Sequence, residues 1–333
     1  MKYCFRAGTA VVVHVSALSI LLLALLPTTA NACDLCAVFN AIETQRGGSA
    51  HSAYLGLANQ YTYSGSGIKP PELDNLKDQY LRSNISQVYG GYWLTERIGL
   101  QANVPFIFKS YRRIEDGQNE RGSERGVGDM SMLLKAVPYR LLRDDVVINT
   151  EIFGGIKLPT GDSDRLQEEL DEVINIVTGG PLDTGNLVGG DDLALGSGST
   201  DFFGGIGLFT RYQNWVISGN AQYTYRQEGD FEYRYGNDFQ WDVGPSYYAL
   251  LEHDRTLLVR LRLSGEYKDD DEILGVNIDG SDEQNVFLGP ELIYTGGSHF
   301  SAKASFELPL EAGDAADGVV PRYRAVLNAA WTF

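Results

Sequence analysis

Apolar and polar residues alternate along most of the chain with the period of two that is typical of β-strands. The pattern is clearest at the C-terminus, where Tyr323, Ala325, Leu327, Ala329, Trp331 and Phe333 interleave with Arg322, Arg324, Asn328 and Thr332. The same period recurs upstream and predicts strands at 51–63, 79–93, 98–112, 126–138, 145–158, 198–212, 214–227, 238–252, 255–268, 284–295, 298–311 and 319–333. The second of these segments leaves its facing ambiguous.

The connections between the predicted strands alternate between short and long. Short ones lie near 95–97, 141–144, 213–214, 253–254 and 296–297, and long ones near 64–78, 113–125, 159–197, 228–237, 269–283 and 312–318. An even strand number with this alternation is typical of outer-membrane barrels, whose short turns face the periplasm. The predicted fold class is therefore all-β, a transmembrane antiparallel up-and-down β-barrel of twelve strands.

The N-terminus has the three parts of a signal peptide. Lys2 and Arg6 precede an apolar run from Val11 to Leu26, and Ala30-Asn31-Ala32 forms a small-residue cleavage site. A retained transmembrane helix is one alternative, because the run is nearly long enough to span a bilayer. A lipoprotein anchored at Cys33 is another. We predict cleavage after residue 32.

The mature chain contains no run of 18 apolar residues, so a closed barrel is the structure with which it could cross a membrane. A content of 19 Tyr, 14 Phe and 38 Gly fits such a protein. The predicted organisation is a signal peptide at 1–32, a periplasmic N-terminal segment at 33–50 and an outer-membrane barrel of a Gram-negative cell at 51–333.

Charge and the chain end indicate the partners. The formal net charge of the full chain is −17, and phosphate binding by nucleic-acid proteins needs a basic face, so no nucleic-acid partner is predicted. The last strand, ending at Phe333, resembles the signature that the barrel-assembly machinery reads. Outer-membrane lipid and lipopolysaccharide are further expected partners. The predicted outer loops are acidic, and divalent cations could bridge them to lipopolysaccharide. The alternative is that these loops are simply solvated.

Strict alternation places the polar side chains in the lumen. The inward candidates for a constriction are Arg260, Arg262, Arg322, Arg324 and Lys303, together with Glu266, Glu291 and Glu307. A basic constriction would attract anionic solutes. The alternative is a set of salt bridges that neutralise one another across a narrow lumen.

The longest predicted loop contains a candidate helix. Leu166, Leu170, Val173, Ile174 and Val177 recur at helical spacing, and Asp164 with Gln167 has the spacing of a capping box. The apolar stripe would fold onto the barrel mouth as a lid or constriction, or pack only on its own loop.

The mature chain would begin with Cys33-Asp34-Leu35-Cys36, for which a small-loop disulfide is expected in an oxidising compartment. His51, His253 and His299 fall at predicted periplasmic turns, so with these cysteines they are weak candidates for a metal site. Chance placement is the alternative. No metal and no cofactor are predicted.

The glycine-aspartate strand start at 126–138, its echo at 196–211 and the aromatic C-terminus together resemble the outer-membrane channel family linked to meta-pathway degradation of phenol and other aromatic compounds. The resemblance implies passive uptake of small solutes. The paired cysteines at 33 and 36 are not a feature of that family.

Three functions are compatible with these patterns. The first is a channel or transporter for passive passage of small solutes, with anionic and aromatic compounds as candidate classes and no enzymatic activity. The second is a non-conducting structural or assembly barrel with a periplasmic partner. The third is an outer-membrane hydrolase, which needs a His beside a Ser nucleophile near the outer leaflet, where no His is expected.

Overall fold

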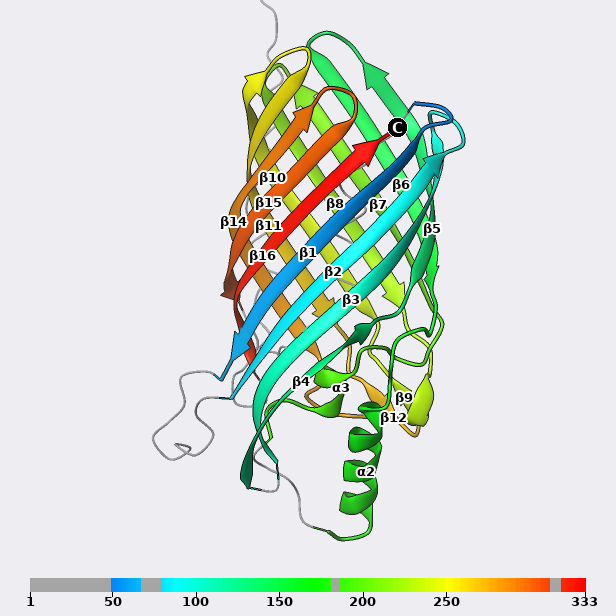
Figure 1. The fold of residues 1–333 in the computed structure, drawn as a ribbon, viewed down its shortest axis with the longest axis vertical. Coiled ribbons are helices and arrows are strands. Elements are labelled where there is room, and N and C mark those ends of the chain that lie inside the picture. Colours follow the sequence, from blue (N-terminus) through cyan, green and yellow to red (C-terminus); the bar gives the residue numbers. More distant parts are fainter. Residues whose placement is uncertain (1–48, 67–78, 116, 181–185, 312–318) are drawn as a thin grey trace, which may run out of the picture.

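The protein forms one closed antiparallel sheet in a computed structural model that describes residues 49–66, 79–115, 117–180, 186–311 and 319–333 (Figure 1). The wall consists of β1 (Ala53–Gly65), β2 (Tyr80–Trp93), β3 (Ile98–Glu115), β4 (Gln118–Val127), β5 (Ser131–Leu142), β6 (Val146–Lys157), β7 (Asp201–Tyr212), β8 (Trp215–Tyr225), β10 (Asp238–Leu251), β11 (Arg255–Lys268), β14 (Glu283–Gly296), β15 (Phe300–Glu311) and β16 (Val320–Thr332). β1 pairs with both β2 and β16, which closes the barrel.

β4 and β5 occupy a single place in the wall. β5 pairs with the first part of β3, at Ile98–Asn103, and β4 pairs with the second part, at Phe106–Glu115. The two segments are one strand interrupted at residues 128–130. The barrel is therefore twelve-stranded, and the predicted fold class is confirmed.

One predicted loop proved to be a hairpin. The sequence pattern assigned residues 113–125 to a connection, but β3 continues to Glu115 and β4 returns from Gln118. Both faces of this hairpin carry polar residues because it projects beyond the lipid-facing band, so it lacks the apolar alternation that marks the other strands.

The long loops gather at one end of the barrel, opposite the short turns (Figure 1). They carry a small sheet of β9 (Tyr233–Arg234), β12 (Glu272–Ile273) and β13 (Val276–Asn277), preceded by the short helix η2 (Asp230–Glu232). The third outer loop, residues 158–200, contributes α2 (Leu166–Val177) and α3 (Gly190–Leu193). No helix in the described part of the chain is long and apolar enough to span a membrane.

The predicted helix of the third outer loop is confirmed as α2, but its predicted capping box is wrong. The residue that caps its N-terminus is Arg165, without a side-chain hydrogen bond to the helix. The Asp164 amide instead donates to the Asp162 side chain at 3.0 Å, so the local turn precedes the helix rather than starting it.

Side chains alternate between lipid and lumen as the pattern required. On β11, Val259 and Leu261 are exposed on the outside, whereas Arg260 and Arg262 are buried inside. β2 inverts this polarity near the loop end, because its apolar side chains face the lumen and Arg82, Asn84 and Ser86 face outward. The inversion explains why the sequence left this strand ambiguous.

Candidate functional site

The lumen has a charged wall built from β10, β11, β14, β15 and β16. Its centre is Arg260, whose guanidinium lies 2.7 Å from a carboxylate oxygen of Asp242 and 3.0 Å from one of Glu291. The Lys303 ammonium lies 3.8 Å from the same glutamate. These strands are neighbours in the sheet, so inward positions on successive strands bring the charges together.

The second half of the charged wall is centred on Glu307. Its carboxylate accepts hydrogen bonds from Arg262 at 2.7 Å and from Arg324 at 2.8 Å, and Arg324 also donates to Glu266 at 3.0 Å. The Arg262 guanidinium lies 3.6 Å from Asp242, which joins the two halves. Of the eight predicted constriction residues, the structure brings seven into this wall, together with Asp242.

The charged wall is electrically balanced. Its four cations are Arg260, Arg262, Lys303 and Arg324, and its four carboxylates are Asp242, Glu266, Glu291 and Glu307. Buried ions persist where a partner neutralises them and satisfies their hydrogen bonds. This arrangement matches the salt-bridge alternative for this part of the lumen, because the formal charges of the wall sum to zero.

Arg322 lies outside this wall, which corrects the prediction that it faces the lumen. The pairing of β1 with β16 shifts register between Tyr63↔Tyr323 and Ser64↔Pro321, so Arg322 is the extra residue of a β-bulge. Its side chain is exposed, and its guanidinium donates to the Ser66 carbonyl at 2.7 Å. An unbroken alternation could not reveal this bulge.

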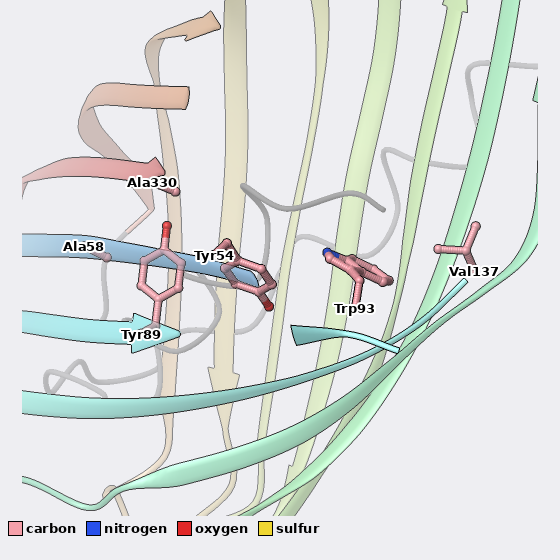
Figure 2. Close-up of a cluster of buried hydrophobic side chains, with 6 residues drawn as sticks. All are labelled: Tyr54, Ala58, Tyr89, Trp93, Val137 and Ala330. Carbon is pink, nitrogen blue, oxygen red and sulfur yellow. The ribbon is translucent and has the colours of Figure 1, made fainter. Parts of the chain in front are cut away.

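An apolar wall lies on β2 and β3, away from the strands that carry most of the charged wall. It consists of the lumen-facing residues Leu81, Ile85, Tyr89, Trp93, Ile107 and Tyr111. At the short-turn end its rings meet Tyr54, Ala58, Val137 and Ala330 (Figure 2). The ring hydroxyls are anchored, since Tyr54 donates to Gln101 at 2.8 Å and Tyr89 to Asn328 at 2.6 Å.

Two glycines let these rings lie flat against the wall. A Cβ at Gly56 would come within 2.2 Å of the Tyr89 ring, and one at Gly91 within 2.3 Å of the Tyr54 ring. Aromatic rings that cover strand glycines are a known device for stabilising a sheet. Here they also keep the rings close to the wall.

The third outer loop enters the barrel mouth and packs against the apolar wall. Leu195 contacts Ile85 and Ile107, and Leu187, Val188 and Leu193 cluster with Leu81, Tyr111 and Val319. The Lys109 ammonium donates to the Ala194 carbonyl at 2.7 Å. The segment 186–197 therefore constricts the lumen.

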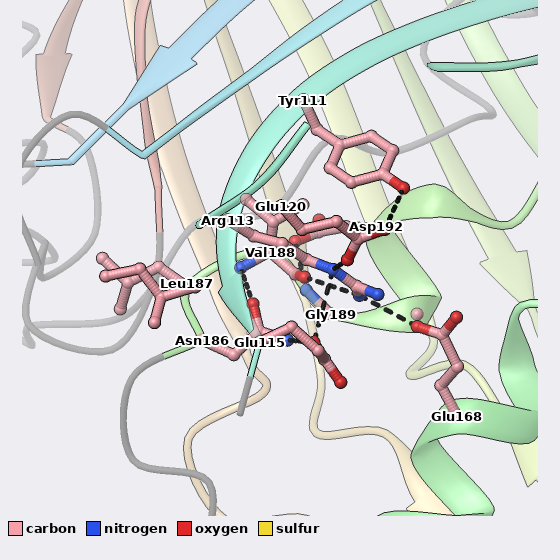
Figure 3. A network of polar contacts seen from close by, with 12 residues as sticks. Tyr111, Arg113, Glu115, Glu120, Glu168, Asn186, Leu187, Val188, Gly189 and Asp192 are labelled. Carbon is pink, nitrogen blue, oxygen red and sulfur yellow. Dashed lines mark hydrogen bonds and ion pairs between the residues drawn. The ribbon is translucent and has the colours of Figure 1, made fainter. Parts of the chain in front are cut away.

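Arg113 fixes this loop from the wall (Figure 3). Its guanidinium donates to Glu120 at 2.7 Å, to Glu168 at 2.9 Å and to the Val188 carbonyl at 3.4 Å. One β3 side chain thus connects β4, α2 and the inserted segment. The sequence pattern does not indicate a role for Arg113, because it predicts a loop at residues 113–125.

The apolar stripe of α2 was predicted either to cover the barrel mouth or to pack only on its own loop. Leu166 is fully buried with Ala194, Tyr233 and Ile273, and Leu170 and Val173 pack beside this cluster. The helix thus packs on its own loop and on the neighbouring outer loops, while the lumen is constricted by the segment that follows it.

A half-buried acidic group connects α2 to α3. The Glu169 carboxylate accepts from the Gly190 amide at 2.5 Å and from the Asp191 amide at 3.4 Å. Burial, and then the nearby Asp191 charge, raise the pKa of Glu169 to about 8. Burial likewise raises the pKa of Asp192 well above its usual value.

A second ionic cluster lies at the junction of β4 and β5. Lys157 lies 2.8 Å from Asp129 and 2.7 Å from Asp201, and Arg226 joins Asp201 at 3.2 Å and Asp238 at 2.8 Å. The two glycine-aspartate motifs of the sequence therefore meet on one lysine. Their similarity was a signal for this contact, but the lysine between them was not recognised as its centre.

His51, His253 and His299 lie at the short-turn end of the barrel, and within the described part of the chain they do not form a cluster with other possible metal ligands. The His299 ring lies 2.8 Å from the Thr332 carbonyl and stacks on Trp331. The residues that the structure describes contain no group of three or more His, Cys, Asp or Glu side chains that could hold a metal ion. The predicted pair Cys33 and Cys36 lies outside the described residues.

The family model described as "Putative MetA-pathway of phenol degradation" matches residues 57–319 of the chain. No curated protein matches the chain. Among solved structures, the chain is similar to an outer membrane channel from Pseudomonas putida F1, with a TM-score of 0.59 and 15% identity over 87% of this chain and 98% of the other. At this identity the likeness shows the barrel fold.

Two further barrels are similar at lower scores. The β-domain of the Bordetella autotransporter BrkA has a TM-score of 0.44 and 11% identity over 85% of this chain and 100% of the other. The monoaromatic hydrocarbon channel CymD has a TM-score of 0.36 and 8% identity over 92% and 94% of the two chains.

Proposed function

We propose that the barrel is an outer-membrane channel for passive passage of small apolar or aromatic solutes. The chain belongs to the family that is described as "Putative MetA-pathway of phenol degradation". The observation that carries the proposal is the apolar wall, which lines a barrel whose other side is a neutralised ionic network. Such a wall offers an aromatic solute dispersion contacts, and the cations beside it, Lys109 and Arg113, donate to carbonyls of the inserted segment.

In this proposal the third outer loop controls entry. Leu195 covers Ile85 and Ile107, so a solute from outside reaches the apolar wall when the inserted segment moves. The balanced charges of the charged wall support aromatic solutes over anionic ones, because an anion would have to displace carboxylates from their arginines.

The proposal includes the cellular route. Residues 1–32 act as the signal peptide, residues 33–50 remain in the periplasm with a disulfide between Cys33 and Cys36, and the barrel-assembly machinery reads the strand that ends at Phe333. No catalytic step is part of the proposal. A hydrolase would need a histidine near the outer leaflet, and His51, His253 and His299 lie at the other end.

The test is single-channel recording of the refolded protein in planar bilayers. We expect a small conductance that phenol reduces more strongly than glycerol does at equal concentration. The variant Leu195→Ala removes an apolar contact worth about 2 kcal/mol, so the channel should spend more time open. The lipid-facing Leu327→Ala is the matched control and should leave the current unchanged.

The structural barrel is the second candidate, favoured by the neutralised charges and the inserted loop. Folded protein that carries no current, with Leu195→Ala equally silent, would overturn the channel and support this alternative.

A further inference from the structure

Two buried amide side chains of the lumen have no hydrogen-bond partner among the residues that the structure describes. They are Gln222 on β8 and Asn285 on β14, and each is 1% exposed. In both side chains the oxygen and the nitrogen alike lack a partner within this described part. Buried polar groups of proteins are nearly always hydrogen-bonded, so two such amides indicate a site that a ligand completes.

The two amides belong to one row of the sheet. Gln222 pairs with Gln240 of β10, Gln240 with Glu266 of β11, and Glu266 with Asn285. All four residues occupy inward positions of their strands. Neighbouring strands lie about 4.8 Å apart, so the four side chains form a continuous polar arc. We refer to these four residues as the amide row.

The amide row lies across the lumen from the apolar wall. In the closed sheet, β14 lies four strands from β2 in one direction, and β8 lies four strands from β3 in the other, with β4 and β5 counted as one place. The strands from β8 to β14 are therefore opposite β2 and β3. A solute between them would meet hydrophobic side chains on one side and amides on the other.

The charged groups near the amide row are held in ion pairs. Within the row, Glu266 accepts a hydrogen bond from Arg324 at 3.0 Å. On the outer side of the row, the Lys268 ammonium lies 3.3 Å from a carboxylate oxygen of Glu283. A charged solute would have to displace one of these partners and would also lose its own hydration. A neutral solute can use the amides without breaking an ion pair.

The chemistry of the two amides selects the group that they can bind. Each amide offers an acceptor oxygen and a donor nitrogen. A hydroxyl group both donates and accepts, so it can satisfy either atom. A hydrocarbon would leave Gln222 and Asn285 as they are, and a polar site discriminates strongly against a ligand that leaves its groups without a hydrogen bond.

We propose that the amide row binds the hydroxyl group of a neutral solute whose apolar body lies on the apolar wall. The inference rests on the proposed function, because it names the class of solute that the channel takes: hydroxylated compounds in preference to hydrocarbons and carboxylates. Both amides are buried in this structure, so a solute reaches them when the inserted segment moves, as in the entry step above.

The test is fluorine NMR of three matched probes with the barrel in lipid nanodiscs, measured against empty nanodiscs. The wild type should bind para-fluorobenzyl alcohol more tightly than para-fluorotoluene or para-fluorobenzoate. The double variant Gln222→Met/Asn285→Leu replaces both amides by apolar side chains of similar volume. Its affinity for the alcohol should fall about tenfold, as expected for the loss of one or two hydrogen bonds, whereas its affinity for the toluene should not fall.

The matched control is Gln284→Met, which removes an amide from the opposite face of the same strand. It should bind all three probes like the wild type. Heat-modifiable gel migration confirms that each variant is folded. Equal affinity of the double variant and the wild type for the alcohol would overturn the inference and leave the amides as binders of water alone.

Single-channel recording of the same proteins separates this inference from the proposed function. A barrel that conducts but binds the alcohol and the toluene equally rejects the hydroxyl site and keeps the channel. A barrel that selects the alcohol through Gln222 and Asn285 but carries no current keeps the site and rejects passage through the lumen.

Discussion

At the scale of single residues, buried charge is the main feature of this barrel. Arg260 and Arg262 are each 1% exposed, and Glu291 and Glu307 are 0% exposed. An ion taken out of water is tolerated when partners repay its lost hydration, and removal of one partner from such a set is strongly destabilising. Each carboxylate of the charged wall is therefore needed by its arginines.

Replacement of Glu307 by Gln tests this dependence. The carboxylate binds Arg262 and Arg324 together, so Glu307→Gln removes one carboxylate from each guanidinium, while Arg324 keeps its contact with Glu266 and Arg262 keeps its contact with Asp242 at 3.6 Å. We expect the free energy of unfolding in urea to fall by about 3 kcal/mol. If the lumen conducts, the reversal potential in a salt gradient should shift towards anion selectivity, because the wall gains one positive charge.

The exposed Glu252→Gln is the control for that change, since its pair with Arg255 lies in a solvated turn. A surface pair contributes about 0–1 kcal/mol, so its loss should have little effect. Similar unfolding energies for the two variants would mean that the charged wall is not held by its ion pairs.

At the scale of elements, the third outer loop decides whether the mouth is narrow. Its inserted segment is held by Lys109, Arg113 and the apolar wall, and its α2 contacts the neighbouring loops through Leu166. The contact between α2 and α3 depends on the protonation of Glu169, since this carboxyl lies beside Asp191.

This contact should weaken as pH rises. The pKa of Glu169 is about 8 in the folded loop and near its ordinary value of 4.5 in the opened loop. The stabilisation is therefore fully present below pH 4.5 and is lost as pH rises to about 8, because the opened state then binds fewer protons. Amide hydrogen exchange of residues 186–197, measured from pH 5 to pH 8 and corrected for intrinsic rates, should show falling protection.

The variant Glu169→Gln mimics the protonated side chain and should reduce the pH dependence of protection; the part that remains is expected from Asp192, whose pKa is also raised by burial. Asp171→Asn, an exposed change on the same helix, should retain the wild-type pH dependence. A pH dependence in Glu169→Gln as large as that of the wild type would assign the effect to another group.

At the scale of the whole molecule, closure of the barrel depends on β1 and β16. The last residues take part directly, since the Phe333 amide donates to the Ala53 carbonyl at 2.8 Å and the Thr332 amide to the His299 carbonyl at 2.7 Å. Phe333 as a whole residue is 69% exposed. The backbone of this terminus closes the sheet, whereas the ring is available for recognition.

We therefore expect Phe333→Ala to separate closure from assembly. The purified variant should refold into lipid vesicles as well as the wild type, because its backbone hydrogen bond remains. In cells, the amount of folded protein in the outer membrane should fall about tenfold. This factor corresponds to the loss of about 1.4 kcal/mol of binding between the Phe333 ring and the barrel-assembly machinery. Heat-modifiable migration measures both.

Phe306→Ala removes a similarly exposed lipid-facing ring and is the control. Equal assembly of Phe333→Ala and wild type in cells would reject a role of the terminal ring in recognition. Failure of Phe333→Ala to refold in vesicles would instead assign the ring to closure.

The sequence by itself determined the strand number, most strand bounds and the facing of strict segments such as β11 and β15, because a period of two converts directly into two faces of a wall. It also located α2, whose apolar spacing is local. Seven of the eight candidates for a constriction face inward for the same reason, since an inward position in a regular strand is fixed by its neighbours, whereas their role in a constriction stays a prediction.

Only the tertiary structure decided which charges meet, where Arg322 points and what fills the mouth. Ion pairs such as Arg262 with Glu307 join strands that are not adjacent in the chain, and the bulge at Arg322 depends on the partner strand. The insertion of residues 186–197 depends on the apolar wall across the lumen. Periodicity specifies a side of the sheet, whereas contact across a closed barrel requires the three-dimensional arrangement of all its strands.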